Sequence, residues 1–294
     1  MDDTDRRRQG RDAIRRVPRS LNLPADLDIL SERWNTVVLL GDSGVVAKAT
    51  TLSHLARRTP ARWFQQELTV CANLTRLGAQ VQQPFDNTVH IDDETRIAVS
   101  LWLLVPGEMG EATEEELVDS LAEIHRLGEQ IELDQPWFAT ITEHFPDVFA
   151  AFRDRNLLDP DMTSKVQELY LRHMDKLDSY DLKQSFIHGD AQRKNAIATD
   201  TGAVWIDLEE CSIGPVAWDL ACLAMHGRFD TDRILDRYAE TSGDDRIPNK
   251  AISTLHELRD LEALTWMIAI QEERDDEFQH ATRQMLAAWR TSVG

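Results

Sequence analysis

Apolar residues follow two different patterns along the chain, and the change from one to the other divides the sequence. From residue 21 to about 105 the pattern is mostly that of strands, because 36–40 and 45–50 are rich in β-branched residues and are separated by a short glycine-containing turn. One helical segment lies among them at 61–77, where apolar side chains recur every three or four residues until Gly78. We therefore expect a small strand-rich lobe here.

The pattern becomes mainly helical after the segment PGEMG at 106–110. Strands in this half are expected at 185–190, 195–199 and 203–208, and we expect them to pair with one another. The chain thus predicts two lobes, 21–105 and 106–294, joined by a Pro-Gly hinge. The expected helices of the second lobe are 114–127, 162–177, 215–225, 234–239 and, with interruptions, 250–290.

Charge is distributed unevenly between the N-terminus and the rest of the chain. Residues 1–20 are charged, Arg-rich and poor in apolar side chains, so we expect a loosely held basic arm there. The whole chain has 294 residues and a net charge of −20. A body this acidic repels nucleic acid and anionic membranes, which argues against both as partners. It would concentrate small cations, although acidity can equally serve solubility alone.

Composition indicates a cytoplasmic globular protein. The chain has no apolar run of about 18 residues, as a membrane-spanning helix would need, and no apolar segment typical of a secretory signal at its N-terminus. Its three cysteines, Cys71, Cys211 and Cys222, are scattered and form no CxxC pair, which favours reduced buried thiols over zinc or disulfides. Oligomeric state is not readable from the sequence.

Lys48 and Glu67 are candidate partners in the first lobe. Lys48 lies mid-strand on the same face as Val46, and a buried lysine needs a counter-charge. Glu67 lies at the margin of the apolar stripe of helix 61–77, so its carboxylate faces inward or nearly so. The alternatives are an edge-strand lysine that discourages aggregation and a solvated glutamate paired with Arg62 or Arg76. A strand lysine held by a helix glutamate is how kinase-like enzymes direct an ammonium at nucleotide phosphates.

Polar residues gather in HGDAQRKN, residues 188–195, between two apolar segments. Phosphoryl transfer from a nucleotide needs one carboxylate to orient the attacking hydroxyl and oxygen ligands to hold Mg²⁺. Asp190 and Asn195 can supply the carboxylate and one ligand. Asp207 follows at the end of the next strand, twelve residues after Asn195, and a hairpin of that length brings its ends together.

The octet, followed by IDLEECSIGPVAWDLA at 206–221, resembles the signature of aminoglycoside phosphotransferases and their choline-kinase-like relatives. The resemblance extends from about residue 27 to near the end of the chain. It implies an α+β, bilobal protein-kinase-like fold, with a small antiparallel-sheet lobe carrying one helix and a larger, mainly helical lobe. It also implies transfer of the γ-phosphoryl of ATP or GTP to a small-molecule hydroxyl with Mg²⁺; the sequence does not choose between the two nucleotides.

The resemblance implies roles for the residues that match its motifs. Asp190 would be the catalytic base or the residue that orients the hydroxyl, and Asn195 and Asp207 would bind Mg²⁺. Lys48 and Glu67 would be the pair that directs an ammonium at the phosphates. The backbone of the hinge would hold the nucleotide base, through Leu103, Leu104 and Val105.

Three further residues would support the catalytic loop structurally. His188 would brace the loop, and His125 would pack beneath it as a core histidine. Asp219 would hold the loop through backbone amides, with a plain helix N-cap as the alternative or additional role. Two departures are visible: the nucleotide-covering turn near 31–36 has no glycine, and DFG and APE sequences are absent, which argues against a protein substrate.

Acidic residues near the end of the chain are the candidates for binding the acceptor. In the family such residues line the pocket for polyamine antibiotics, and carboxylates suit a cationic amino sugar or cyclic peptide. For any single one of them a solvated helix face is the simpler explanation. The candidate substrate residues are Glu262, Trp266, Glu272 and Glu273.

We therefore expect a small-molecule kinase acting on a hydroxyl of a cationic antibiotic or metabolite, with an aminoglycoside or tuberactinomycin antibiotic favoured. Such an enzyme would confer antibiotic resistance. Choline, a macrolide, an amino sugar or homoserine are alternative acceptors. A non-catalytic nucleotide-binding regulator is a remote alternative, since it would require an incomplete set of residues, whereas Lys48, Glu67, Asp190, Asn195 and Asp207 are all present.

Overall fold

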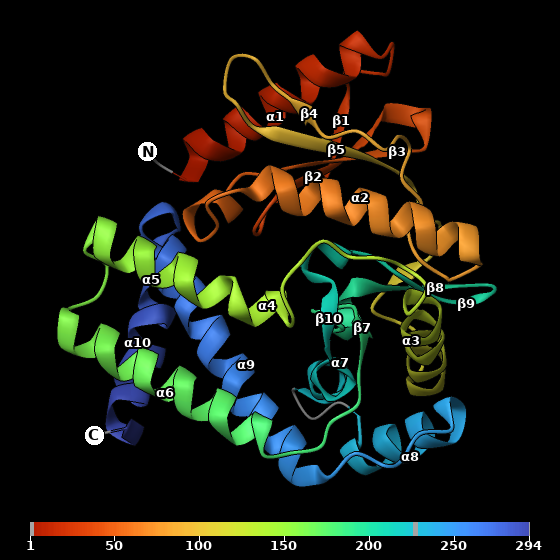
Figure 1. Ribbon diagram of the computed structural model, residues 1–294. Helices are drawn as coiled ribbons and strands as arrows, with labels where there is room; N and C mark the ends of the chain where they lie inside the picture. Colours follow the sequence, from red (N-terminus) through yellow and green to blue (C-terminus); the bar gives the residue numbers. More distant parts are fainter. Residues whose placement is uncertain (1–2, 226–228, 294) are drawn as a thin grey trace.

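A computed structural model describes residues 3–225 and 229–293 and divides them between two lobes (Figure 1). The smaller lobe contains an antiparallel sheet in the strand order β1-β2-β3-β5-β4. Helix α1 packs against one face of this sheet and α2 against the other (Figure 1). Its elements are α1 (Asp3–Ser20), β1 (Leu27–Ser31), β2 (Thr36–Leu40), β3 (Val45–Ala49), α2 (Pro60–Leu77), β4 (His90–Ile91) and β5 (Ala98–Leu103).

Helix α1 corrects the expectation of a loosely held arm at residues 1–20. A narrow stripe of small and apolar residues, which includes Ala13 and Ile14, is buried against the sheet. Gly10 belongs to this stripe, and a Cβ there would lie 2.5 Å from the Thr51 side chain, so the glycine permits the close approach. Some arginines of α1 find acidic partners outside the helix, as Arg11 does with Glu32 at 2.6 Å and Arg16 with Asp92 at 2.7 Å.

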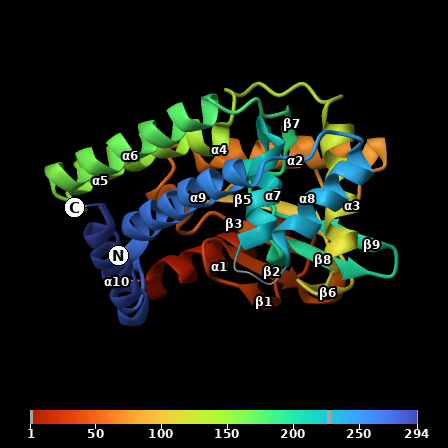
Figure 2. The same cartoon turned by 90° about the horizontal axis from the view of Figure 1, so that it is seen from below.

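The larger lobe is mainly helical. Figure 2 shows α9 running through it, where it packs against α5, α6 and α7. The helices are α3 (Glu114–Gly128), α4 (Ala139–Thr142), α5 (His144–Arg155), α6 (Pro160–Asp178), α7 (Val216–Ala224), α8 (Thr231–Ser242), α9 (Asn249–Ile270) and α10 (Asp276–Val293). The strands are β6 (Glu108–Met109), β7 (Gln184–Ile187), β8 (Ala196–Thr199), β9 (Gly202–Trp205) and β10 (Ser212–Pro215).

Strand pairing in this lobe differs in part from the sequence-based prediction. β8 and β9 form the expected hairpin, and β6 joins them on the β8 side. β7 does not pair with this hairpin but with β10, in an antiparallel arrangement. The hairpin lies between β7 and β10 in sequence. Because these two strands pair with each other, the polar loop after β7 and the segment after β9 are held next to each other. None of the described helices is both long enough and apolar enough to cross a membrane.

The two lobes meet along α2 and the segment that follows β9. Gln66 of α2 donates a 2.7 Å hydrogen bond to the carbonyl of Cys211. The chain leaving α2 bonds to β9 through the backbone, with Gln82 N–H donating to Trp205 O at 2.8 Å. In the turn before β2, the Trp34 ring makes an edge-to-face contact with Trp266 of α9, at 5.6 Å between centroids. These contacts fix the smaller lobe over the polar loop of the larger one.

Candidate active site

The polar loop 188–195 begins where β7 ends and is held against the segment after β9. Gly189 adopts φ +89°, and a Cβ there would lie 2.2 Å from the carbonyl oxygen of Glu210, so only glycine allows this approach. His188 is buried, and its Nε2 donates to the carbonyl of Ile206 at 3.0 Å. Its Nδ1 then accepts the backbone N–H of Asp190 at 3.2 Å. The loop therefore has a fixed conformation before any ligand is considered.

Asp219, fully buried on α7, supports this loop from below. Its carboxylate accepts the backbone N–H groups of His188 at 2.6 Å and Gly189 at 3.0 Å. His125 of α3 places Nε2 2.9 Å from the same carboxylate, and its Nδ1 lies 2.8 Å from the hydroxyl of Tyr238. Helix α7 begins at Val216 with Pro215 as its N-cap, so Asp219 is not a helix N-cap. The contacts of Asp219 and His125 are those that the proposed support of the loop 188–195 would require.

We expect Asp219→Asn to destabilise the fold by about 3 kcal/mol, because one accepting oxygen becomes an NH₂ group facing backbone donors in a buried site. Urea unfolding followed by circular dichroism measures this. Asp200→Asn, in the exposed turn between β8 and β9, is the matched control and should change stability by less than about 0.5 kcal/mol. Equal urea midpoints for the two variants would contradict the supporting role of Asp219.

Asp190 lies in the loop with both carboxylate oxygens engaged. Oδ2 accepts from Asn195 Nδ2 at 2.8 Å, and Oδ1 accepts from Gln192 Nε2 at 2.6 Å and from Arg259 of α9. Burial by itself raises the pKa of this carboxyl, but the positive charges of Arg259 and Lys194 outweigh burial and lower it. Asp190 is therefore an ionised carboxylate at neutral pH.

Asn195 and Asp207 occupy the two ends of the β8–β9 hairpin. The backbone joins them, since Ile206 N–H donates to Asn195 O at 2.9 Å. Both side-chain hydrogen bonds of Asn195 to described residues use its Nδ2, which leaves the amide oxygen for a metal ion. Asp207 follows in a left-handed conformation, φ +64°, that turns its carboxylate out of the strand. A carboxylate and an amide oxygen are the hard donors that suit Mg²⁺, so these residues fit the expected ion.

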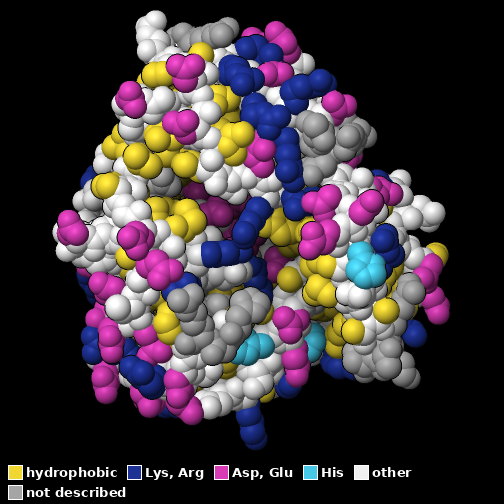
Figure 3. All heavy atoms as spheres, turned by 180° about the vertical axis from the view of Figure 1, so that it is seen from behind, with side chains coloured by type: hydrophobic (Ala, Val, Ile, Leu, Met, Phe, Trp, Pro, Cys, Tyr) yellow, Lys and Arg dark blue, Asp and Glu magenta, His cyan; other side chains and the backbone are white. Residues whose placement is uncertain are grey.

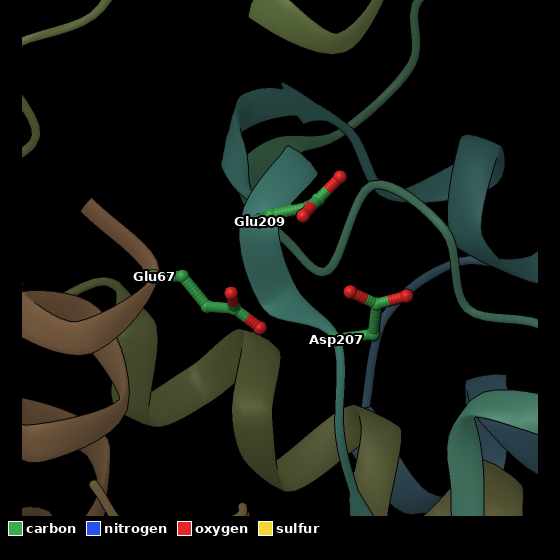
Figure 4. A group of neighbouring side chains, drawn as sticks. All are labelled: Glu67, Asp207 and Glu209. Carbon is green, nitrogen blue, oxygen red and sulfur yellow. The ribbon is translucent and has the colours of Figure 1, made fainter. Parts of the chain in front are cut away.

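Lys48 lies in the middle strand of the sheet and faces three carboxylates. Its Nζ is 3.0 Å from Glu67, 2.5 Å from Asp207 and 2.8 Å from Glu209. Figure 4 shows these carboxylates converging from α2 and from the segment after β9. The central position excludes the edge-strand alternative for Lys48, and burial of Glu67 against Lys48 excludes a solvated glutamate.

Burial and the charged partners act in opposite directions on the pKa of Lys48 and on that of Glu67. Burial lowers the pKa of Lys48, but the carboxylates of Asp207, Glu209 and Glu67 more than offset this and raise it well above its usual value. Burial raises the pKa of Glu67 to about 8 against the lowering effect of Lys48. The ammonium stays charged, and it occupies the place between the carboxylates where a small cation would otherwise lie.

The sequence analysis missed a group of buried arginines and glutamates beyond Lys48. Arg57 binds Glu209 at 2.7 Å and also Glu210, and its guanidinium lies 5.0 Å from the centroid of Trp266. Burial raises the pKa of Glu210 to about 8, although Arg57 opposes it. The position of Glu209 and Glu210 directly after Asp207 was a usable signal. The two arginines, Arg57 and Arg259, carry no local signal, because their partners are distant in sequence.

The four expected substrate residues lie in two places. Glu262 and Trp266 are on the part of α9 that faces the loop: Glu262 binds Arg259 at 2.6 Å, and Trp266 stacks on His144 with 5.3 Å between ring centroids. Glu272 and Glu273 lie past the end of α9, where Glu272 pairs with Arg155 at 2.9 Å and Glu273 with Arg6 at 3.6 Å. The two pairs are therefore separated along the chain and engaged by different arginines.

The backbone of the expected hinge is partly used by the protein itself. Leu103 N–H donates to Gln83 O at 2.9 Å, and Leu104 N–H donates to Gly44 O at 2.8 Å. Gln82 Nε2 also donates to the carbonyl of Leu103, at 3.0 Å. Contacts to a nucleotide base from Leu103, Leu104 and Val105 stay a prediction, and they would use other backbone groups of this segment than the N–H of Leu103, the N–H of Leu104 and the carbonyl of Leu103.

Figure 3 shows the face of the molecule that is hollowed between the lobes. Acidic side chains lie in the depth of this hollow, with hydrophobic side chains beside them and basic side chains across its mouth. Asp190, Asn195 and Asp207 lie on segments of the larger lobe, and Lys48 and Glu67 lie on β3 and α2 of the smaller one. The set combines one ionised carboxylate, hard oxygen donors and a fixed ammonium.

The family model described as the phosphotransferase enzyme family, APH, matches residues 29–261, most of the chain. The chain belongs to this family. The family supports a kinase or phosphotransferase activity for the chain. Among curated proteins, none matches the sequence significantly.

Solved structures with the same fold include three small-molecule kinases. Amicoumacin kinase hAmiN, in complex with AMP-PNP, Ca²⁺ and Ami, has a TM-score of 0.67 at 13% identity, over 94% of this chain and 91% of that one. The GDP and kanamycin complex of APH(2")-IIia gives 0.62 at 11% identity, over 91% and 93%. Choline kinase LicA from Streptococcus pneumoniae gives 0.60 at 17% identity, over 92% and 96%. These neighbours confirm the expected bilobal protein-kinase-like fold.

Proposed function

We propose that the chain is a kinase that transfers the γ-phosphoryl of ATP or GTP, with Mg²⁺, to a hydroxyl of a cationic small molecule. The observation that carries this is the approach of Lys48, held by Glu67, toward Asp207, while Asn195 contacts both Asp190 and the strand leading to Asp207. Phosphoryl transfer depends on positioning and charge stabilisation, which is what this set can provide.

Each residue has a definite task in the proposed reaction. Asp207 and the amide oxygen of Asn195 would hold Mg²⁺, which supplies positive charge to the phosphates. The ammonium of Lys48, directed by Glu67, would bind the phosphate oxygens.

Asp190 would accept a hydrogen bond from the acceptor hydroxyl and later its proton. His188, His125 and Asp219 would keep the loop in place, and Val105 would contact the base.

A cationic acceptor is favoured by the net charge of the chain, −20. The carboxylates of Glu209, Glu210 and Glu262 add little to this, because Lys48, Arg57 and Arg259 already pair with them. The neighbouring kinases bound to kanamycin and to Ami support an antibiotic as the acceptor, and we take an aminoglycoside or tuberactinomycin as the first candidate. We place this reaction in the cytoplasm, where nucleoside triphosphates are available.

An acceptor panel tests the proposal. Purified protein with Mg²⁺ and either ATP or GTP would be incubated with aminoglycosides, tuberactinomycins, macrolides, choline, amino sugars and homoserine, and nucleoside diphosphate release measured. We expect turnover with at least one cationic compound and a raised resistance of a susceptible bacterium expressing the chain, if that compound is an antibiotic. Tight binding of the Mg²⁺–nucleotide with no transfer to any acceptor would favour the non-catalytic regulator instead.

A further inference from the structure

Helix α9 places a buried guanidinium directly on Asp190. Arg259 is 8% exposed, and one of its terminal nitrogens, Nη2, donates to Asp190 Oδ1. The other, Nη1, binds Glu262 Oε2 at 2.6 Å and lies 3.9 Å from Glu210. The indole of Trp218 is beside the guanidinium, at 5.7 Å from its centroid. A planar guanidinium bound at both ends has little freedom to rotate.

The hydrogen bonds of Asp190 distinguish its two oxygens. Oδ1 accepts from both Gln192 and Arg259, which accounts for both of its lone pairs. Oδ2 accepts a single hydrogen bond from described residues, that of Asn195. One lone pair on Oδ2, next to the residue expected to hold the metal ion, is therefore left for an incoming hydroxyl.

We propose that Arg259 is a positioning residue for phosphoryl transfer, fixing Asp190 through Oδ1 so that Oδ2 receives the acceptor hydroxyl. This inference rests on the proposed function. Glu262 holds Arg259 from one turn further along α9 and so acts on Asp190 through Arg259, not on the acceptor. An arginine that only neutralised buried carboxylates would affect stability and leave the geometry of the reaction unchanged.

The kinetic test uses the acceptor identified in the panel, or water as acceptor with MgATP and MgGTP when phosphate release is measured. Arg259→Met should lower kcat on the order of 10²-fold, because a displacement of Asp190 by about 1 Å suffices for such a loss. The KM of the nucleotide should stay within about twofold of wild type, because Arg259 does not contact Lys48 or Asp207. Arg259→Lys should recover only part of the lost kcat. Its single ammonium cannot bind the carboxylates of Asp190 and Glu262 at the same time.

A double variant separates catalysis from folding. Arg259→Met with Glu262→Met removes Glu262 together with its partner, so no unpaired charge is left at position 262, whereas Asp190 still loses its guanidinium. We expect this variant to unfold at a higher urea concentration than Arg259→Met alone and still to show the full loss of kcat. The losses of kcat that the two single substitutions cause should not add in the double variant, because both act on Asp190 through one contact. Additive losses would instead place Glu262 on the acceptor and overturn its assigned role.

Arg237→Met is the matched control, because Arg237 also forms a two-point pair with a carboxylate, Asp119, but on α8 and α3. It should leave kcat within about twofold of wild type. Wild-type kcat in Arg259→Met, or a faster reaction, would overturn the inference while leaving the proposed function intact. A wild-type protein without any turnover would overturn the proposed function and this inference with it.

Discussion

Replacing Asp190 with asparagine or alanine should lower phosphoryl transfer by about 10²- to 10⁴-fold, the usual contribution of a general base. Asparagine keeps the size of the side chain and can still accept from Arg259, but it cannot take a proton or hold a negative charge. The loss should fall on kcat, because the role that we propose for Asp190 is toward the acceptor hydroxyl and not toward the nucleotide. Single-turnover measurements with the identified acceptor would record it.

Nucleotide binding provides the control for the Asp190 variants. Calorimetric titration with a non-hydrolysable analogue and Mg²⁺ should give affinities within about threefold of wild type, because the expected nucleotide contacts come from other residues. Asp200→Asn, on the exposed turn of the hairpin, should match wild type in both assays. Wild-type turnover in Asp190→Asn on the same acceptor would show that another group serves as the base.

Replacing Lys48 with methionine should reduce kcat/KM on the order of 10²- to 10³-fold, as the loss of one preorganised donor to developing negative charge does. The variant also leaves Glu67, Asp207 and Glu209 without their shared cation. Lys48 lowers the pKa of both Glu67 and Glu209, so its loss should raise both pKa values. Steady-state kinetics with varied nucleotide would show a raised nucleotide KM together with the lower kcat.

Lys48→Arg separates the two roles of this ammonium. Arginine keeps the positive charge between the carboxylates, so the urea midpoint should stay closer to wild type than that of Lys48→Met. Its larger planar group cannot place a point charge at the same position, so turnover should remain low. Lys250→Met, an exposed lysine on α9, should have no effect on either quantity. Full activity in Lys48→Arg would mean that charge alone suffices.

Much of the site could be predicted because local periodicity determines which face of an element is buried. Alternation along β3 places Val46 with the cleft side and Ala47 with the opposite core, as the two separate clusters around them confirm. The helical stripe of α2 likewise places Glu67 at the buried margin. The hairpin between Asn195 and Asp207 follows from chain length alone, since a connection this short leaves few other arrangements.

The remaining features depend on contacts that no local pattern encodes. Arg57 and Glu210 are separated by 153 positions, and Arg259 and Asp190 by 69, so neither partner changes the periodicity around the other. Helix α1 was misjudged for the same reason: its arginines look unsuited to packing until Asp92 supplies a counter-charge. The pairing of β7 with β10 was missed because the β8–β9 hairpin lies between them in sequence.

Helix α1 has a practical consequence for any shortened form of this protein. The sheet face beneath it carries Val38, Leu40 and Leu101, all fully shielded from water when α1 is in place. A chain begun at residue 21 would present this apolar surface to solvent, and exposed surfaces of that kind favour self-association. The charged segment 1–20 therefore shields an apolar face of the smaller lobe, and we expect its removal to promote self-association.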